Sequence, residues 1–567
     1  MPGSIVYKGI GIGKCKVVQE FQYQIREEII SPAGTSAEME AFETVVVQAV
    51  AQIRKLKEHA RVRIGEEEAG IFEAHEMMAE DPMLLDAIRT KIGTKGFSSE
   101  KAVLSARDEF VTMFMNIEDA YIRERAHDVQ DVCGRFLDLL LGVNSNPLED
   151  LDEATVVIAK DLKPSQTVLL DENVQGIALE IGSATSHAAI VAKAKGIPTI
   201  IGEEDITQKV KDGDLIVIDA RKNKILINPN ANVLYGYREQ AKAEAAEKER
   251  LAGLRDLDAV TLDGRRIKLY GNIGSAMEAK RVGDQGGRGV GLTRTEFLYM
   301  DNSHFPTEEE QFIQYRKITE SAGEEVIIRT LDIGGDKTLP YFSFPEELNP
   351  FLGFRALRFC LERRDIFDVQ LRAILRASAY GKVKIMFPMI ATLDEFRKAK
   401  QCVENAKDAL RNEGIPFDEA IETGIMVEIP SAAIFADILA KECDFFSIGT
   451  NDLCQYALAV DRMNPHIKDL YQPMHPAIIR LIKGVVEAGH GNGREVGVCG
   501  ELGSDELGAL MLLGLGIDEL SVSLSMIPVI KERIRSVRYE DLKEWVAGCL
   551  DLDNEAAVKE ELERRLS

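Results

Sequence analysis

The sequence predicts a multidomain α/β protein: a C-terminal (β/α)8 TIM barrel, preceded by a small α/β domain that carries an inserted four-helix bundle. Three patterns support this fold class. Eight strand-like runs alternate with helical sequence after residue 260, helical periodicity fills residues 33–145, and short apolar runs flank that helical stretch. At about 100–200 residues per domain, 567 residues also suggest three or four folding units.

The barrel is predicted over residues 260–567. Each of its strand-like runs is short, rich in branched or aromatic residues and followed by a helical pattern, as in a chain of βα units. These runs are 267–271, 289–293, 325–329, 383–389, 424–429, 444–448, 495–499 and 517–521.

The small α/β domain is predicted from two separated segments, residues 1–32 and 146–231. Turn signals divide the second segment into the strand-like runs 154–159, 176–181, 198–201, 214–218 and 225–227. The β-like residues 1–20 would otherwise be unpaired strands, so we expect them to complete this sheet. The intervening residues 33–145 then form an insertion.

The insertion is predicted to be a bundle of four helices. Thr35 and Glu38 have the spacing of a capping box, and apolar residues then recur every three or four positions through 40–60, 68–78, 100–116 and 121–141. Asp81-Pro82 breaks this pattern, as is typical of proline at a helix start or a turn. A polar, proline-free stretch at 232–259 predicts a helical linker between the small domain and the barrel.

Charge and cysteine content narrow the functional classes. Lys and Arg total 69 against 94 Asp and Glu, a formal net charge of −25, which argues against nucleic-acid binding and favours a basic protein partner. Eight cysteines without a CxxC pair indicate a reducing compartment. The absence of a signal-like N-terminus or an apolar run of about 18 residues predicts a cytoplasmic protein without a membrane span.

Polar residues follow several predicted barrel strands. Arg294 and Arg329 end the second and third strands, Glu428 the fifth, Asn451-Asp452 the sixth and Cys499 the seventh, with Arg462 shortly after the sixth. The carboxyl ends of barrel strands share one mouth, so these side chains are predicted to meet there.

This set of residues suits a small phosphorylated acid with Mg²⁺. Arginine matches phosphate and carboxylate oxygens, Glu428 and Asp452 offer hard oxygen ligands for Mg²⁺, and the Cys499 thiol can supply a proton to carbon. Each residue also has a plainer interpretation: a surface ion pair for an arginine, a helix cap for Glu428, and a buried core position for Cys499.

His187 is the candidate phosphoryl acceptor. It falls in the first turn of a helix predicted from Ala188 onward, and Thr185 or Ser186 is placed to cap that helix. A helix N-terminus stabilises a phosphate group through free N–H donors and the helix dipole. The alternative is a capping turn that contains an incidental histidine.

The motif TSHAAIVAKAKGIP resembles the phosphohistidine motif of enzyme I of the bacterial phosphotransferase system, within the PEP-utilising enzyme family (PEP, phosphoenolpyruvate). The resemblance extends in order along nearly the whole chain, through IFEAHEMMAEDP, YIRERAHDVQDVCGR, GLTRTEFLYM, RTLDIGGDK, LPYFSFPEELNPFLGFRALR, VEIPSAA, SIGTNDLCQY and VCGELG.

The resemblance implies a PEP–protein phosphotransferase that passes a phosphoryl group from PEP to His187 and then to a histidine of the carrier protein HPr, the first step of sugar uptake. It implies that Mg²⁺ is bound by Glu428 and Asp452, and that Cys499 protonates the enolate. It further implies PEP binding by Arg294, Arg329, Asn451, Asp452 and Arg462, with Arg355 in a less direct role.

The resemblance also assigns two interfaces. The helical insertion corresponds to the HPr-docking region, in segments containing Glu66, Glu67, Glu68, His75 and Arg125, although these residues would equally suit the solvated faces of a bundle. The barrel is expected to form a homodimer.

Two departures from the family pattern bear on function. Ser183-Ala184 replaces the usual glycine and basic residue before Thr-Ser-His, and Cys454 replaces a hydroxyl residue in TNDLCQY. The Ser183-Ala184 departure leaves open the alternative that this chain is a paralogous phosphotransferase, which serves a specialised or regulatory carrier. A nucleotide-dependent dikinase or synthase needs a further domain, and a regulatory phosphoprotein would not need the intact set at the barrel mouth.

Overall fold

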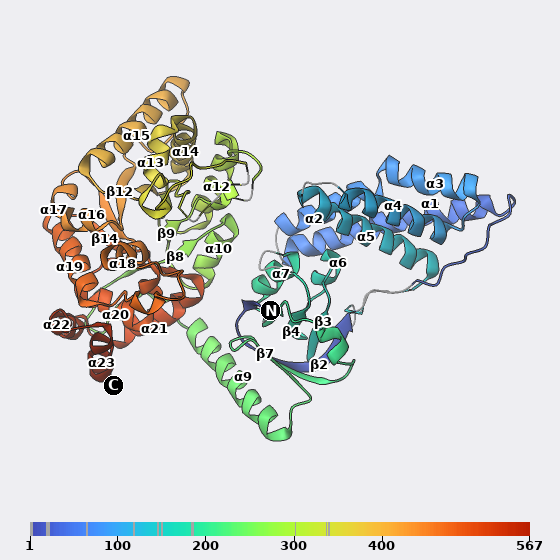
Figure 1. The fold of residues 1–567 in the computed structure, drawn as a ribbon, viewed down its shortest axis with the longest axis horizontal. Coiled ribbons are helices and arrows are strands. Elements are labelled where there is room, and N and C mark those ends of the chain that lie inside the picture. The colour runs from blue at the N-terminus through green and yellow to red at the C-terminus, as the bar shows by residue number, and fades with distance from the viewer. Residues whose placement is uncertain are drawn as a thin grey trace. The chain divides into compact units, whose positions relative to one another are not determined.

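The computed structural model describes residues 4–18, 23–63, 66–116, 120–143, 147–148, 151–182, 186–300, 302–335, 337, 339 and 341–566. The chain divides into two units, residues 1–246 and 247–567, and each is considered by itself (Figure 1). None of the helices in the described ranges has the length and apolarity needed to cross a membrane.

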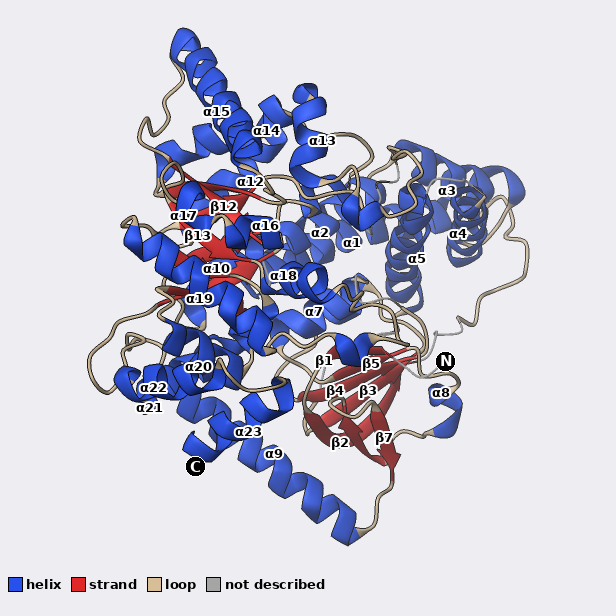
Figure 2. Cartoon of the chain, turned by 60° about the vertical axis from the view of Figure 1, so that its left-hand side comes forward, coloured by secondary structure: helices blue, strands red, loops and turns tan. Residues whose placement is uncertain are grey.

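The first unit contains a seven-stranded mixed sheet in the order β1-β5-β4-β3-β2-β6-β7 (Figure 2). Its strands are β1 (Ser4–Tyr7), β2 (Ile10–Val18), β3 (Thr155–Ala159), β4 (Val174–Leu179), β5 (Thr199–Ile201), β6 (Leu215–Asp219) and β7 (Lys224–Ile227). β2 pairs in parallel with β3 and antiparallel with β6, so the N-terminal strands lie within the sheet as predicted. The short helices on this sheet are α6 (Pro164–Thr167), α7 (His187–Lys195) and α8 (Ile206–Lys209).

Five helices, not the predicted four, lie between β2 and β3 in the described part of the chain. They are α1 (Thr35–Arg63), α2 (Glu66–Ala79), α3 (Pro82–Lys95), α4 (Ser99–Met115) and α5 (Ala120–Leu141). The prediction missed α3 because Asp81-Pro82 looked like an interruption. Asp81 instead caps a new helix, accepting from the Met83 and Leu84 amides, and Pro82 occupies its first position, where no N–H is required.

The helix α9 (Ala231–Ala252) coincides with most of the stretch predicted to be a linker. All but one of its residues are at least partly exposed, in keeping with its Ala-, Glu- and Lys-rich sequence; Leu251 near its end is buried.

The second unit is a closed barrel of eight parallel strands, in the order predicted for a TIM barrel (Figure 2). The strands are β8 (Lys268–Ile273), β9 (Val290–Thr293), β10 (Val326–Arg329), β11 (Val383–Phe387), β12 (Glu422–Val427), β13 (Phe445–Ile448), β14 (Glu495–Val498) and β15 (Glu519–Ser523). Every one overlaps a predicted run.

Helices surround these strands and bury their apolar faces against them. They are α10 (Ala276–Asp284), α11 (Phe297–Met300), α12 (Glu308–Ser321), α13 (Ala356–Glu362), α14 (Arg364–Ala377), α15 (Leu393–Glu413), α16 (Pro430–Ile434), α17 (Ala436–Leu439), α18 (Thr450–Leu458), α19 (Pro476–Gly491), α20 (Glu506–Leu515), α21 (Ile527–Ser536), α22 (Tyr539–Cys549) and α23 (Glu555–Leu566). One continuous apolar core joins the outer strand faces to these helices.

Candidate active site at the carboxyl ends of the barrel strands

Four strands deliver predicted site residues to one end of the barrel. Arg329 is the last residue of β10, while Glu428 and Cys499 come directly after β12 and β14. Asn451 and Asp452 lie in the first turn of α18, which follows β13. Parallel strands with matched register bring these residues to the same mouth.

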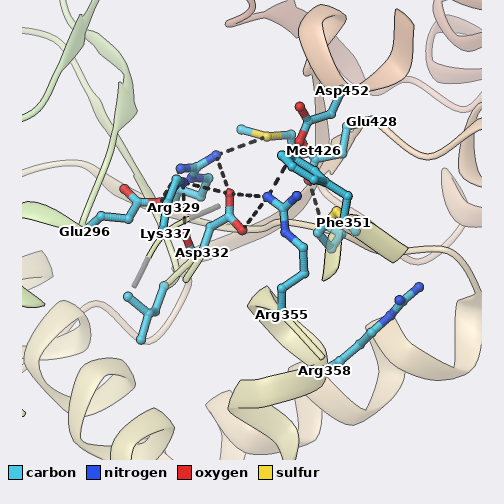
Figure 3. A network of polar contacts seen from close by, with 12 residues as sticks. Glu296, Arg329, Asp332, Lys337, Phe351, Arg355, Arg358, Met426, Glu428 and Asp452 are labelled. Atoms are coloured by element: carbon cyan, nitrogen blue, oxygen red, sulfur yellow. Dashed lines mark hydrogen bonds and ion pairs between the residues drawn. The ribbon is translucent and has the colours of Figure 1, made fainter. Parts of the chain in front are cut away.

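Arg329 is buried and held by two carboxylates (Figure 3). Its Nη2 pairs with Glu296, and its Nη1 lies 3.3 Å from Asp332 Oδ2. Lys337 Nζ contacts the same two acids, at 3.2 Å from Glu296 and 3.3 Å from Asp332. The Nε of Arg329 has no hydrogen-bond partner among the described atoms. A buried guanidinium with an unpaired donor suits an anionic ligand.

Arg355 contributes a second buried guanidinium to this cluster. Its Nη2 lies 2.9 Å from Asp332 Oδ1 and 3.7 Å from Asp452 Oδ2. Its Nε and Nη1 lack partners within the described structure. The resemblance implies a less direct role for Arg355 in substrate binding. In the structure Arg355 lies as deep in this cluster as Arg329 and contacts both Asp332 and Asp452 (Figure 3).

The surrounding charges set the ionisation of the acids. Burial opposes ionisation of Asp332, but Arg329, Lys337 and Arg355 hold the pKa of that carboxyl well below its usual range. Burial also opposes ionisation of Glu296, whose pKa is nonetheless lowered by Arg329 and Lys337. The cluster of three cations and two ionised acids is therefore nearly balanced in charge.

Glu428 behaves differently, because burial and the neighbouring Asp452 raise its pKa to about 8. Its Oε1 accepts a hydrogen bond of 2.7 Å from the Met389 amide. The N-cap of the following helix, α16, is Ile429, so the alternative role of Glu428 as a helix cap is not observed.

Asn451 and Arg462 form a second polar group around Glu501. Glu501 Oε1 accepts from Asn451 Nδ2 and from Arg462 Nη1, each at 3.1 Å, and the Glu501 amide donates to Asn451 Oδ1 at 3.0 Å. The η4 turn (Glu501–Ser504) after β14 thereby aligns the Asn451 amide and the Arg462 guanidinium.

Cys499 and Arg294 complete the predicted set. The Cys499 thiol is buried and donates weakly to the Ile448 carbonyl, with sulfur and oxygen 3.8 Å apart. Burial raises its pKa to about 11, so it is a protonated thiol near neutral pH. Arg294 follows β9 at the same end of the barrel, where its side chain is exposed.

Comparison with known proteins identifies the family. The family descriptions "PEP-utilising enzyme, PEP-binding domain", "PEP-utilising enzyme, N-terminal" and "PEP-utilising enzyme, mobile domain" match residues 248–539, 2–125 and 151–223. A phosphoenolpyruvate-protein phosphotransferase of Staphylococcus aureus is 43% identical over 97% of this chain and 97% of its own. The chain belongs to the PEP-utilising enzyme family.

A second curated relative matches over the full length. A phosphoenolpyruvate-protein phosphotransferase of Haemophilus influenzae is 43% identical over 100% of this chain and 98% of its own length. An NMR structure of an Enzyme I protein is 34% identical and covers 43% of this chain and 99% of its own, with a TM-score of 0.38.

The segment that carries the mobile-domain match contains His187, the first residue of α7. Ser186, one of the two predicted candidates, is the N-cap, and its Oγ accepts from the Ala189 amide at 3.4 Å. Gly196, in the left-handed conformation, ends the helix. The side chain of His187 and residues 183–185, including Thr185 and the Ser183-Ala184 departure, lie outside what the structure describes.

In the helical insertion, His75 is buried rather than solvated. Its Nε2 lies 3.1 Å from Asp128 Oδ1, and Arg125 pairs with the other oxygen of Asp128 at 3.2 Å. Glu66, Glu67 and Glu68 lie in α2, and their side chains are outside the described set. The other departure, Cys454, is fully buried in the barrel core.

Sequence reasoning missed Glu296, Asp332 and Lys337. All three stand inside the motifs that carried the family resemblance, two residues after Arg294 and within RTLDIGGDK. Their acid–base pattern offered a signal, since closely spaced opposite charges beside a strand end suggest a paired cluster.

Proposed function

We propose that this chain transfers the phosphoryl group of PEP to its own His187 and then to a histidine of an HPr-type carrier in the cytoplasm, releasing pyruvate. The observation that carries the proposal is the pair of buried guanidiniums, Arg329 and Arg355. Both keep unpaired N–H donors, and Arg355 Nη2 lies 3.7 Å from Asp452 Oδ2. The family to which the chain belongs and the full-length phosphotransferase relatives support the same reaction.

In the barrel, Arg294, Arg329, Arg355, Asn451, Asp452 and Arg462 bind and orient PEP. The guanidiniums neutralise the phosphate and carboxylate, and their fixed positions lower the cost of organising charge during transfer. Arg329 and Arg355 need little rearrangement, because Asp332 already holds them in place.

Glu428 and Asp452 fit a Mg²⁺ site. No group of three or more His, Cys, Asp or Glu residues suited to a metal occurs in the described ranges. Two hard carboxylates nevertheless suffice for Mg²⁺, which keeps waters and substrate oxygens as its other ligands. Burial and the charge of Asp452 raise the pKa of Glu428, and a cation held by these two residues would favour their ionised forms. Bound there, Mg²⁺ would supply positive charge to the phosphate.

Cys499 donates its thiol proton to C3 of the enolate as the phosphorus–oxygen bond breaks, and the neutral Nε2 of His187 attacks the phosphorus in line. Protonation at carbon traps the product as pyruvate. The N-terminus of α7 then stabilises the phosphohistidine.

The second transfer requires His187 to leave the barrel mouth. The domain formed by residues 1–32 and 146–231 is proposed to swing on the linker at 232–259, so that His187 reaches a carrier docked on residues 33–145. Residues 260–567 would form the homodimer. A carrier with a basic face suits the net charge of −25.

The test is incubation with radiolabelled PEP and Mg²⁺, with and without HPr. His187→Ala should lose all protein-bound label, whereas His304→Ala, a change at an exposed histidine of the barrel, should keep it. Label that remains on His187→Ala would overturn the acceptor assignment. Efficient labelling of His187 without transfer to HPr would favour the specialised-carrier alternative.

A further inference from the structure

The inside of the barrel holds a carboxyl group directly below the Cys499 thiol. In the wall of the barrel, Ser447, Gly497 and Glu519 lie side by side in register on β13, β14 and β15. Gly497 and Cys499 are two residues apart and therefore share one face of their strand. Glu519 thus stands one layer below Cys499, toward the amino ends of the strands.

Two glycines make room for this carboxyl group. A Cβ on Gly497 would lie 3.2 Å from Glu519 Cβ and 3.4 Å from its Oε1, and a Cβ on Gly291 would lie 2.3 Å from the same oxygen. With both positions lacking a side chain, Glu519 extends across the interior instead of outward. It is only 3% exposed.

Two polar atoms near the thiol, one from Glu519 and one from Ser447, are not paired with each other or with the backbone. Glu519 Oε1 and Ser447 Oγ are buried and have no hydrogen-bond partner among the described residues. Ser447 stands beside the Cys499 thiol and acts against the rise in its pKa. The Glu519 carboxyl and the Ser447 hydroxyl lie on strands either side of Gly497. Both can therefore still form hydrogen bonds on the side that leads to the Cys499 sulfur.

The charged groups that face Glu519 favour its protonated form. Burial and then Glu325 raise its pKa to about 8; Glu495 acts in the same direction, and Lys384 and Lys268 act against it. After burial, the charge of Glu519 is one of the causes that raise the pKa of Cys499, the titratable group above it. Lys268 and Glu495, whose side chains are 33% and 31% exposed, connect this region to solvent at the amino-terminal mouth.

We propose that Glu519 is the internal acid that restores the proton of Cys499 after each turnover. This inference rests on the proposed function, and Glu519 acts through Cys499 without touching the substrate. The S–H bond breaks as the C3–H bond of pyruvate forms. The resulting thiolate takes the proton of the Glu519 carboxyl through the Ser447 hydroxyl, and the Glu519 carboxylate is reprotonated from water at the amino-terminal mouth.

The surroundings of the sulfur explain why this route is needed. Cys499 packs among the buried side chains of Leu292, Ile327, Met386, Met426 and Phe445. A thiolate left in such apolar surroundings is unstable. A neutral acid one layer away returns the proton without opening the site.

The test compares two exchange reactions in the full-length protein, neither of which needs a carrier. Label exchange between PEP and pyruvate measures the chemical cycle, and deuterium entry into the pyruvate methyl group in D2O measures solvent access to the Cys499 proton. Glu519→Gln keeps the size and hydrogen-bonding capacity but loses the acid. We expect the ratio of deuterium entry to label exchange to fall at least tenfold.

Glu422→Gln is the matched control, since Glu422 begins β12 at the same mouth and its side chain is 41% exposed; its ratio should equal that of the wild type. An unchanged ratio in Glu519→Gln would overturn the inference. Absence of PEP–pyruvate exchange in the wild type would instead overturn the proposed function. If Glu519→Gln does not fold, the same measurement is made on Glu519→Asp. The shorter side chain of aspartate should lower the ratio of deuterium entry to label exchange, and an unchanged ratio would count against the proposal.

Discussion

Asp332 is the residue on which the geometry of the candidate site depends. One carboxylate contacts three cations, Arg329 at 3.3 Å, Lys337 at 3.3 Å and Arg355 at 2.9 Å. Asp332 is the main anchor of Arg355, because the other ion pair of Arg355, with Asp452, is longer, at 3.7 Å. Asp332 thus positions both guanidiniums while leaving their remaining N–H donors free for substrate.

Asp332→Asn should lower kcat/KM for PEP by about 30-fold, or ~2 kcal/mol, because a neutral amide no longer holds the buried cations. The loss should fall mainly on KM if both guanidiniums bind the ground state. Steady-state pyruvate release at varied PEP measures this.

Asp365→Asn is the control, as Asp365 pairs with Arg363 on the surface with its own side chain 63% exposed. A twofold or smaller change in Asp332→Asn would show that the guanidiniums keep their positions without this charge.

At the scale of elements, the C-terminal end of α9 is fixed to the barrel by one buried lysine. Lys531 on α21 donates to three backbone carbonyls, those of Leu254 at 3.2 Å, Arg255 at 2.8 Å and Gly286 at 2.6 Å. Arg250 adds ion pairs with Glu247 and Glu532. Leu254 and Arg255 lie just beyond the helix, so Lys531 closes its last turn onto the barrel.

Lys531→Met should free this junction, because three backbone carbonyls, that of Gly286 among them buried, lose their donor at a cost of about 2–4 kcal/mol. Limited trypsin digestion should then cut after Arg250 or Arg255 at least tenfold faster than in the wild type. Lys559→Met, which removes an exposed lysine of α23, should not change the rate. Equal cleavage rates in Lys531→Met and wild type would mean that packing alone holds the junction.

The sequence predicted elements better than it predicted the contacts between buried charges. All eight barrel strands and the N-terminal strands were found, because apolar runs bounded by turn residues are local signals. α3 was missed because Pro82 has the same local appearance whether it ends a pattern or begins a helix. Glu296, Asp332 and Lys337 were missed because their pairing depends on loops that meet only in the folded barrel.

At the scale of the whole molecule, barrel closure brings together charges that are distant in the chain. Glu325, just before β10, pairs with Lys268 of β8 at 3.1 Å, with Lys382 at 2.8 Å and with Lys384 of β11 at 3.5 Å. Tyr270 donates to the same carboxylate at 3.2 Å. Glu325 and Lys384 are both buried, so their charges are compensated only in the closed barrel.

Glu325→Gln should destabilise the barrel by about 3 kcal/mol near neutral pH, because it leaves excess buried positive charge at this mouth. Although burial opposes its ionisation, the three lysines lower the pKa of Glu325 to about 2. A carboxyl with a lowered pKa stabilises the fold above its unfolded pKa, and this contribution is lost as pH falls toward the folded pKa. The gap between wild type and variant should therefore shrink from pH 5 to pH 3.

Denaturant unfolding of the intact chain at several pH values, followed by the fluorescence of Trp545, measures this gap within the barrel. Trp545 lies on α22 and packs on the barrel core, so its signal reports the unit that contains Glu325. Glu422→Gln should cost much less, since its carboxylate is partly exposed and pairs with Lys384 at 2.9 Å. A gap that stays constant down to pH 3 would show that Glu325 is already neutral in the folded barrel, and that closure depends on packing rather than on this charge.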